Sequence, residues 1–234
     1  MIELKNVTKR YDSLTAVDDV SFSVKKGECF ALLGPNGAGK TTIVKMLLDF
    51  TRPTSGSLSL NGIPSTQAQC RTSIGYLAEN HHIPSSLSGW DYLQRCAELL
   101  DMSRSDATDQ CRRIVQLIGM QGREATKVGT YSKGMIQRFG LGAALMGNPT
   151  LLILDEPTSG LDPIGIRETR QLLESLKGQG ITIFLNSHLL SEVEKICDTA
   201  AIINRGKLLV KDAISAIVKD GDTLEDLFVR VVKG

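Results

Sequence analysis

Short hydrophobic runs separated by polar turns make up the first third of the chain. Their length and their β-branched and aromatic residues are typical of strands. An Asn61-Gly62 pair after the fourth run indicates a tight hairpin turn. This part of the chain should therefore begin a sheet. The predicted strands are Ile2–Tyr11, Val20–Val24, Cys29–Leu33, Ser57–Leu60 and Ile74–Leu77.

The spacing of the hydrophobic residues becomes helical from about residue 88 to about residue 147. Ile136, Phe139 and Ala143, for example, fall on one face of a helix. An earlier helix-compatible run, Thr42–Phe50, stands alone among the strands. The helical spacing of residues 88–147 predicts a lobe of helices inserted into the chain. The helices predicted for the lobe are Leu87–Leu100, Asp106–Ile118 and Lys133–Met146.

Three continuous apolar runs follow in the second half of the chain, at Leu151–Leu154, Ile181–Leu185 and Ala200–Ile203. Parallel strands that are covered on both faces have this character. Helical segments between the runs predict an α/β core. At the end of the chain, Thr223 and Asp226 are spaced as a capping box for an amphipathic helix.

Composition limits the possible classes of protein. With 234 residues, 41% of them hydrophobic, the chain can bury a substantial core as one domain or as a domain with an inserted lobe. The net charge of +1, from 27 basic and 26 acidic residues, does not indicate binding to nucleic acid or to an anionic membrane surface. The apolar runs are far shorter than the roughly 20 residues needed to span a bilayer, and no secretory signal follows Met1. We therefore expect a globular protein of the cytoplasm.

A glycine-rich loop joins the predicted strand Cys29–Leu33 to the predicted helix Thr42–Phe50, with G-x-x-x-x-G-K-T spacing. Glycines let successive N–H groups point inward, and the following helix N-terminus adds a positive dipole end, so a polyphosphate fits there. Lys40 would reach the β- and γ-phosphates, and the Thr41 hydroxyl would ligate Mg²⁺. The alternative is a glycine-rich turn without a ligand. The residues expected to bind the polyphosphate are Gly34, Pro35, Asn36, Gly37, Ala38, Gly39, Lys40, Thr41 and Thr42.

Polar residues also follow two of the buried strands. Asp155 and Glu156 come directly after Leu151–Leu154, and His188 follows Ile181–Leu185. Because an open parallel sheet binds its ligand at the carboxyl ends of its strands, we expect all three beside the phosphate loop. Asp155 would then hold Mg²⁺, Glu156 would polarise a water, and His188 would contact the γ-phosphate. The alternative for the acidic pair is that it merely ends a strand.

Two further polar segments differ in what they indicate. His81 and His82 lie in a polar loop with no partner in view, and we expect each to be structural or solvated. The segment Tyr131–Met135, which reads Tyr-Ser-Lys-Gly-Met, leads directly into a predicted helix. Ser132 could cap that helix and face an anion.

The phosphate loop, Tyr131–Met135, the acidic pair, Ser159–Asp162 and His188 together resemble the ATP-binding cassette family, in the family's order and over almost the whole chain. The resemblance implies an α/β fold: a P-loop NTPase core with an antiparallel β subdomain and an inserted α-helical lobe that carries the signature. On this basis residues 1–234 form a single nucleotide-binding domain. Residues 1–87 and 148–234 make its α/β core, and residues 88–147 make the helical lobe.

The resemblance also implies a mechanism that uses ATP and Mg²⁺. In this family the active unit is a head-to-tail dimer, in which the signature of one protomer closes over ATP held by the phosphate loop of the other. Ser132 and Gly134 occupy the phosphate-facing positions of the signature. Tyr11 matches the aromatic residue that stacks on adenine, with an ordinary edge-strand tyrosine as the alternative.

Two positions depart from the family's usual pattern. Glu79 follows the strand Ile74–Ala78 where the family most often has Gln, and the signature reads Tyr-Ser-Lys-Gly-Met in place of Leu-Ser-Gly-Gly-Gln. Glu79 can still ligate Mg²⁺ or its water. Both variants look like those of cassettes that serve type-2 export systems.

The expected function is that of an ATPase subunit that drives export through a separate membrane permease. The resemblance implies a homodimer or a pair with a similar cassette, located peripherally on the cytoplasmic face of the cell membrane. The alternative is a soluble cassette that acts on ribosomes or DNA, but the chain lacks the second cassette, the long coiled coil and the basic tract of such proteins. No nucleic acid partner is expected. A regulatory module without turnover is disfavoured, because the catalytic set is complete.

Overall fold

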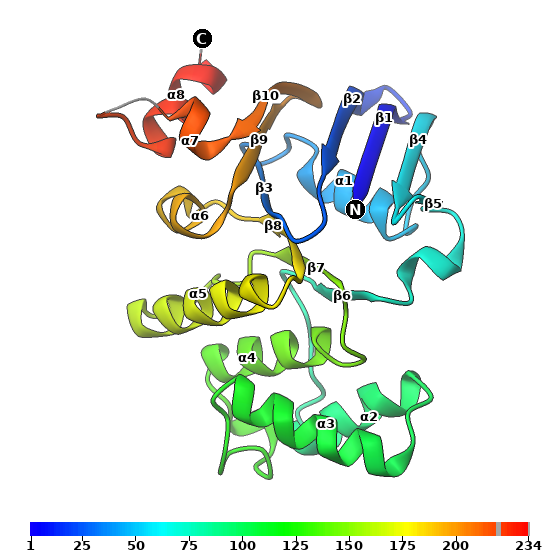
Figure 1. Cartoon of the computed structure of the whole chain (residues 1–234), viewed down its shortest axis with the longest axis vertical. Coiled ribbons are helices and arrows are strands. Elements are labelled where there is room, and N and C mark those ends of the chain that lie inside the picture. Colours follow the sequence, from blue (N-terminus) through cyan, green and yellow to red (C-terminus); the bar gives the residue numbers. More distant parts are fainter. Residues whose placement is uncertain (219–220, 234) are drawn as a thin grey trace. The chain divides into compact units, whose positions relative to one another are not determined.

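The computed structural model describes residues 1–218 and 221–233 (Figure 1). The chain forms two units. The first unit combines Met1–Thr72 with Lys177–Gly234, and the second unit is Ser73–Leu176. The second unit therefore contains all of the segment predicted as a helical lobe, together with the strands on either side of it.

An antiparallel sheet in the first unit has the strand order β2-β1-β4-β5. Burial alternates along its central strand, where Ile2 and Leu4 are buried while Glu3 and Lys5 are exposed, so one face of the sheet packs on the core. The Asn61-Gly62 turn is confirmed, with both residues at positive φ between the last two strands. The strands are β1 (Ile2–Tyr11), β2 (Leu14–Val24), β4 (Ser55–Leu60) and β5 (Ile63–Pro64).

A mainly parallel group of strands, in the order β10-β9-β3-β8, carries the phosphate loop in the first unit. Strand β3 (Cys29–Leu33) pairs in parallel with both β8 (Thr182–Asn186) and β9 (Thr199–Asn204). The edge strand β10 (Lys207–Ala213) is antiparallel to β9. Every residue of β3 and β8 is buried, so both strands are covered on both faces, as predicted for β8. The helical segments of this unit are α1 (Lys40–Leu47), η1 (Ala68–Arg71), α6 (Leu190–Ile196), α7 (Ile214–Ile217) and α8 (Leu224–Lys233).

The predicted amphipathic helix near the end of the chain is confirmed as α8. Thr223 and Asp226 form its capping box, with Thr223 N donating to Asp226 Oδ2 at 2.9 Å and Asp226 N donating to Thr223 Oγ1 at 3.2 Å. Leu224 and Leu227 are buried on its inner face.

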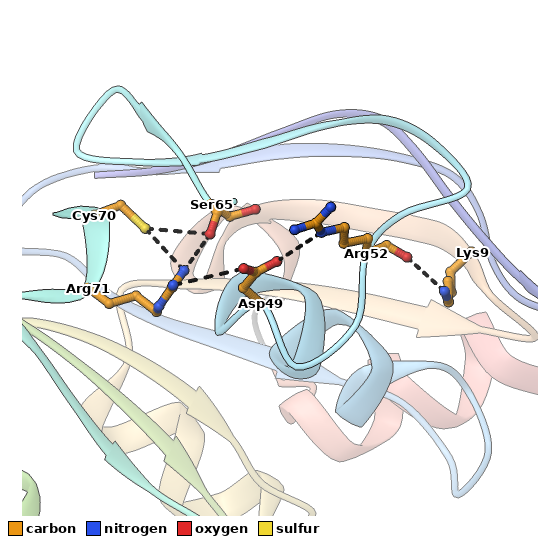
Figure 2. Close-up of polar contacts among 6 residues, drawn as sticks. All are labelled: Lys9, Asp49, Arg52, Ser65, Cys70 and Arg71. Atoms are coloured by element: carbon orange, nitrogen blue, oxygen red, sulfur yellow. Dashed lines mark hydrogen bonds and ion pairs between the residues drawn. The ribbon is translucent and has the colours of Figure 1, made fainter. Parts of the chain in front are cut away.

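Polar contacts hold the C-terminal end of α1, the helix that follows the phosphate loop (Figure 2). Asp49 Oδ2 lies 3.8 Å from Arg71 Nη2, and Asp49 Oδ1 lies 3.7 Å from Arg52 Nε. Arg71 also donates to the carbonyl of Ser65, and Lys9 donates to the carbonyl of Arg52 at 2.7 Å. These contacts connect the segment that follows α1 to β1 and to the segment after β5.

Two parallel strands and a group of helices form the second unit. Strand β6 (Ile74–Leu77) pairs in parallel with β7 (Leu151–Asp155). Figure 1 shows three helices packed side by side, α2 (Gly89–Leu99), α3 (Arg104–Leu117) and α4 (Lys133–Ala144). A short 3₁₀ helix, η2 (Val128–Thr130), precedes α4, and α5 (Pro163–Gly178) leads the chain back to the first unit. The side chains of Ser88, Ser103 and Ser132 cap α2, α3 and α4.

Helix α4 lies directly against β6. A Cβ atom at Gly75 would overlap the carbonyl oxygen of Ala144 at the end of α4, so only glycine allows this approach. A Cβ atom at Gly89 would likewise overlap the ring of Phe139, which is buried and stacks on Tyr131 with ring centres 5.3 Å apart. The beginning of α4 is therefore held in a closely packed part of the unit.

Some predicted boundaries are wrong. Strand β2 begins at Leu14 rather than Val20, because Asp19 has a φ of 52° and the pairing with β1 shifts register nearby. Such a bulge breaks the alternation that marks a strand. Helix α1 begins at Lys40, two residues before the predicted start, and β10 and α7 were not predicted. Among the described residues, none of the helices combines the length and the apolar character that crossing a bilayer requires.

Candidate functional site

Two glycines of the phosphate loop, Gly34 and Gly39, lie where a side chain would not fit. Gly39, the N-cap residue of α1, has a φ of 108°, and a Cβ atom there would overlap the carbonyl oxygen of Ala16. At Gly34 a Cβ atom would overlap the carbonyl oxygen of Ile203 and lie 3.1 Å from the Cγ1 atom of that residue. The loop therefore runs close to β2 and β9, and glycine is required at both positions.

The start of α1 and Lys40 give the loop its positive charge. Gly39 provides no side-chain cap at the N-terminus of α1, and the positive end of the helix dipole lies at the loop. Lys40 Nζ donates to the carbonyl of Gly34 at 2.7 Å and to that of Pro35 at 3.2 Å. The ammonium group is thus held within the curve of the loop, where a polyphosphate would bind.

A pocket of about 440 Å³ extends from the phosphate loop to Tyr11. Tyr11 ends β1 with 41% of its surface exposed, and Lys9 Nζ lies 4.7 Å from the centre of its ring. A volume of this size is typical of small-ligand sites. The pocket places an aromatic face, glycine-rich backbone and a lysine around one space. Its lining residues are Tyr11, Leu14, Thr15, Ala16, Asn36, Gly37, Ala38, Gly39, Lys40, Thr41, Thr42 and Arg205.

Several of the lining residues were not predicted. Ala16 belongs to the part of β2 that the sequence pattern missed, and Arg205 belongs to the turn between β9 and the unpredicted β10. Gly206 N donates to the carbonyl of Ala38 at 3.0 Å, and the carbonyl of Gly206 accepts from Asp18 N at 2.8 Å. The turn is therefore bonded to the phosphate loop on one side and to β2 on the other. Had the sequence pattern predicted the β9–β10 hairpin, its turn would have identified Arg205 as a residue near the phosphate loop.

His188 leaves the sheet beside the phosphate loop. Leu32 of β3 is paired with Asn186 of β8, and both strands run in the same direction. Gly34 and His188, each two residues further on, therefore follow neighbouring strands at the same edge. His188 is exposed, so its imidazole is accessible to a ligand.

In the second unit, the acidic pair follows a fully buried strand. Asp155 and Glu156 are only 4% and 8% exposed, and burial together with the charge of Asp155 raises the pKa of Tyr76. Glu156 has a φ of 52°. Among the described residues other than glycine, the remaining positive φ angles occur at Asn and Asp residues and at Arg205. Gln137 Nε2 donates to the carbonyl of Pro157 at 2.8 Å and supports this conformation. A strained backbone of this kind is typical of functional sites.

In the signature segment, Tyr131–Met135, Ser132 and Lys133 are exposed on the second unit, whereas Tyr131 is buried. The exposed Ser132 accepts from Met135 N at 3.2 Å and caps α4, as predicted. At Gly134 an added Cβ atom would meet Leu161 at an ordinary 3.4 Å, so packing does not require glycine there. Lys133, one of the variant positions of the signature, lies over Gly160, where an added Cβ atom would overlap the ammonium end of the lysine. Glu79 is exposed, two residues after the end of β6.

His81 has the structural role that was one of the two expected for it, with backbone partners that the sequence did not indicate. The Nδ1 atom of His81 is 3.2 Å from the carbonyl oxygen of Ala78, and its Nε2 atom is 3.1 Å from that of Ile136. Ile136 lies 55 residues further along the chain, so no local pattern could have indicated this contact. His82, in contrast, is exposed.

Comparisons with known proteins identify the family of the chain. A family model described as ABC transporter matches residues 17–159. An uncharacterized ABC transporter ATP-binding protein of Nostoc sp. is 43% identical over 205 residues, which cover 87% of this chain and 61% of that protein. The lantibiotic transport ATP-binding protein SrtF of Streptococcus pyogenes is 37% identical over 228 residues, which cover 97% of this chain and 96% of SrtF.

A solved structure of an ATP-binding subunit of an ABC transporter is similar over 99% of both chains, with a TM-score of 0.89 and 28% identity. This likeness confirms the predicted fold class. The chain spans 61% of the length of the Nostoc relative, and so that relative extends well beyond the region of similarity.

Proposed function

The chain belongs to the ABC transporter family, and we propose that it is the ATP-hydrolysing subunit of an exporter whose membrane permease is a separate polypeptide. The main support for this proposal is that Tyr11 and the phosphate loop line the same pocket. An aromatic ring at one end and a phosphate-binding loop at the other match the two ends of a nucleoside triphosphate.

In this proposal the adenine of ATP stacks on Tyr11, and its phosphates lie along the N–H groups of the loop. Lys40 exchanges the carbonyls of Gly34 and Pro35 for oxygens of the β- and γ-phosphates. Such an exchange is favourable, because a charge-assisted hydrogen bond to phosphate is stronger than one to a neutral carbonyl.

The residues proposed as a Mg²⁺ site are Thr41, Asp155 and Glu79. All three offer oxygen atoms, which Mg²⁺ prefers. The deep burial of Asp155 fits this role, because a buried carboxylate needs a cation or strong hydrogen bonds to offset its lost hydration. When bound, Mg²⁺ supplies positive charge to the β- and γ-phosphate oxygens.

For hydrolysis we assign Glu156 as the group that orients the attacking water and accepts its proton. His188 and Lys40 stabilise the negative charge that develops on the γ-phosphate. The positive φ of Glu156 and its burial support the role assigned to it, because strained backbone conformations cluster at active sites.

The complete site is proposed to need a second protomer. Ser132 and Gly134, at the exposed N-terminus of α4, would close over ATP held by the phosphate loop of the other protomer, and the helix dipole would favour the phosphate charge. The partner is a second copy of this chain or a similar cassette. On this view the lobe at residues 88–147 is a functional part of one nucleotide-binding domain.

The export role is proposed from the variants at Glu79 and the signature, and from the similarity to SrtF, whose name assigns it to lantibiotic transport. The chain would then sit peripherally on the cytoplasmic face of the cell membrane, bound to its permease.

Mixed dimers test the shared site directly. One protomer carries Lys40→Ala, which disables its phosphate loop, and the other carries Ser132→Arg, which blocks its signature. Each mutant homodimer should be inactive. If sites form between protomers, both lesions of the mixed dimer fall in one site and the other site is intact.

We therefore expect differently tagged mixed dimers, purified with the permease, to regain ATP-driven closure and some hydrolysis. Circular dichroism of each homodimer must first show that it is folded. Absence of both closure and hydrolysis in the mixed dimer would count against a site shared between protomers.

A further inference from the structure

The imidazole of His81 connects two segments of the second unit that the proposed function uses. Its Nδ1 atom faces the carbonyl oxygen of Ala78 at 3.2 Å, and its Nε2 atom faces the carbonyl oxygen of Ile136 at 3.1 Å. Ala78 directly precedes Glu79, and Ile136 lies in the first turns of α4. Each tautomer of a neutral imidazole donates from one ring nitrogen, so at least one of the two contacts is a hydrogen bond in every protonation state.

The contact with Ala78 closes a short turn. His81 reaches back three residues to that carbonyl, and Glu79 and Asn80 form the tip of the turn. We call residues 78–81 the Glu79 turn. Both residues at its tip are exposed, so the ring of His81 shapes the backbone that presents the Glu79 carboxylate to solvent.

The contact with α4 depends on a glycine. A Cβ atom at Gly140 would overlap the Nε2 atom of His81, so the ring lies against the helix backbone at this point. Glycine is among the least favourable residues in a helix interior. Its presence in the middle of α4 is explained by the space that His81 occupies. The neighbouring approach of Gly75 to Ala144 fixes the other end of the same helix to β6.

We propose that His81 is a positioning residue that joins the Glu79 turn to the signature helix α4, so that Glu79 and Ser132 are held as one body. The inference rests on the proposed function, because it concerns the metal-binding and phosphate-facing roles assigned there. It adds a residue that the family resemblance did not indicate. A shift of the signature helix would, through this ring, move the turn that carries Glu79.

Amide hydrogen exchange of the full chain tests the connection without nucleotide. In the His81→Ala variant we expect faster exchange both in residues 78–81 and in the first turns of α4. Gly140→Ala, which displaces the ring, should have the same effect. His82→Ala is the matched control and should leave both segments unchanged. Unchanged exchange in either segment of His81→Ala would overturn the proposal.

Steady-state ATP hydrolysis then tests the consequence. We expect His81→Ala to lower kcat roughly three- to tenfold and to raise the Mg²⁺ concentration for half-maximal rate, with the Kd for ATP within twofold of wild type. His81→Gln, whose amide can donate to one carbonyl, should recover part of kcat. The Mg²⁺ shift should vanish when Glu79 is already Gln.

A second comparison separates positioning from general stability. Gly140→Ala should reduce kcat when His81 is present and add little in the His81→Ala background, where the space is open. A lowered melting temperature with wild-type kcat and Mg²⁺ dependence would overturn the positioning role. A wild-type chain that binds no Mg-ATP would contradict the proposed function instead, while the exchange experiment would still decide whether His81 joins the two segments.

Discussion

Replacing Gly39 by alanine tests the geometry of the phosphate loop. Gly39 combines a φ of 108° with a site where a Cβ atom would overlap the carbonyl oxygen of Ala16. Two other glycines separate these effects. Gly37, in the same loop, and Gly62, in the remote β4–β5 hairpin, have φ values of 78° and 76°, and an added Cβ atom would meet nothing within 4 Å at either.

The expected magnitudes follow from this comparison. Left-handed backbone costs an L-residue about 1–2 kcal/mol, and overpacking against fixed backbone adds about 1–3 kcal/mol. For a chain of this size, 1 kcal/mol lowers the melting temperature by about 2–4 °C. Gly62→Ala and Gly37→Ala should therefore lower it by about 2–8 °C, and Gly39→Ala, where overpacking adds to the backbone cost, by about 4–20 °C.

Thermal unfolding followed by circular dichroism measures these differences, and titration with Mg-ATP at a temperature where every variant is folded measures binding. Gly62→Ala should keep the wild-type Kd, because the hairpin is outside the pocket. Gly39→Ala should weaken binding more than tenfold, since the start of α1 must move. Equal melting temperatures for Gly39→Ala and Gly62→Ala, or a wild-type Kd for Gly39→Ala, would refute the reasoning.

The remaining predictions concern single side chains. Glu156→Gln should keep Mg-ATP binding and lower phosphate release by about 10²–10⁴-fold, because the amide keeps the shape of the side chain but not its basicity; a wild-type rate would remove Glu156 from catalysis. Glu79→Gln should keep most of the ATPase activity and modestly raise the Mg²⁺ requirement, whereas complete loss of Mg-ATP binding would make the carboxylate a principal ligand. Tyr11→Ala should weaken ATP binding by about 1–3 kcal/mol while Tyr11→Phe stays near neutral, and an unchanged Kd for Tyr11→Ala would leave Tyr11 a structural residue.

Elements whose signal is local were predictable from the sequence. Strand β7 is a continuous apolar run, and the phosphate loop has its whole motif within nine residues from Gly34 to Thr42, so neither depends on distant contacts. The cap of α4 by Ser132 was predicted for the same reason.

Features that depend on distant contacts were missed. The start of β2 is hidden by the bulge at Asp19, and β10 is a half-exposed edge strand without a continuous apolar run. The lining of the pocket by Ala16 and Arg205 depends on both of these elements. The contact of His81 with Ile136 depends on how α4 packs, which no pattern within the loop records.

The left-handed backbone of Glu156 has a consequence for laboratory evolution. Asn tolerates that conformation better and Gly adopts it freely, so either substitution would remove strain of about 1 kcal/mol. A library selected only for heat resistance should therefore enrich substitutions at position 156 early. On the catalytic role proposed for Glu156, the selected variants would be stable proteins that bind ATP but no longer hydrolyse it. Screens for robust variants of this chain need a catalytic readout in every round.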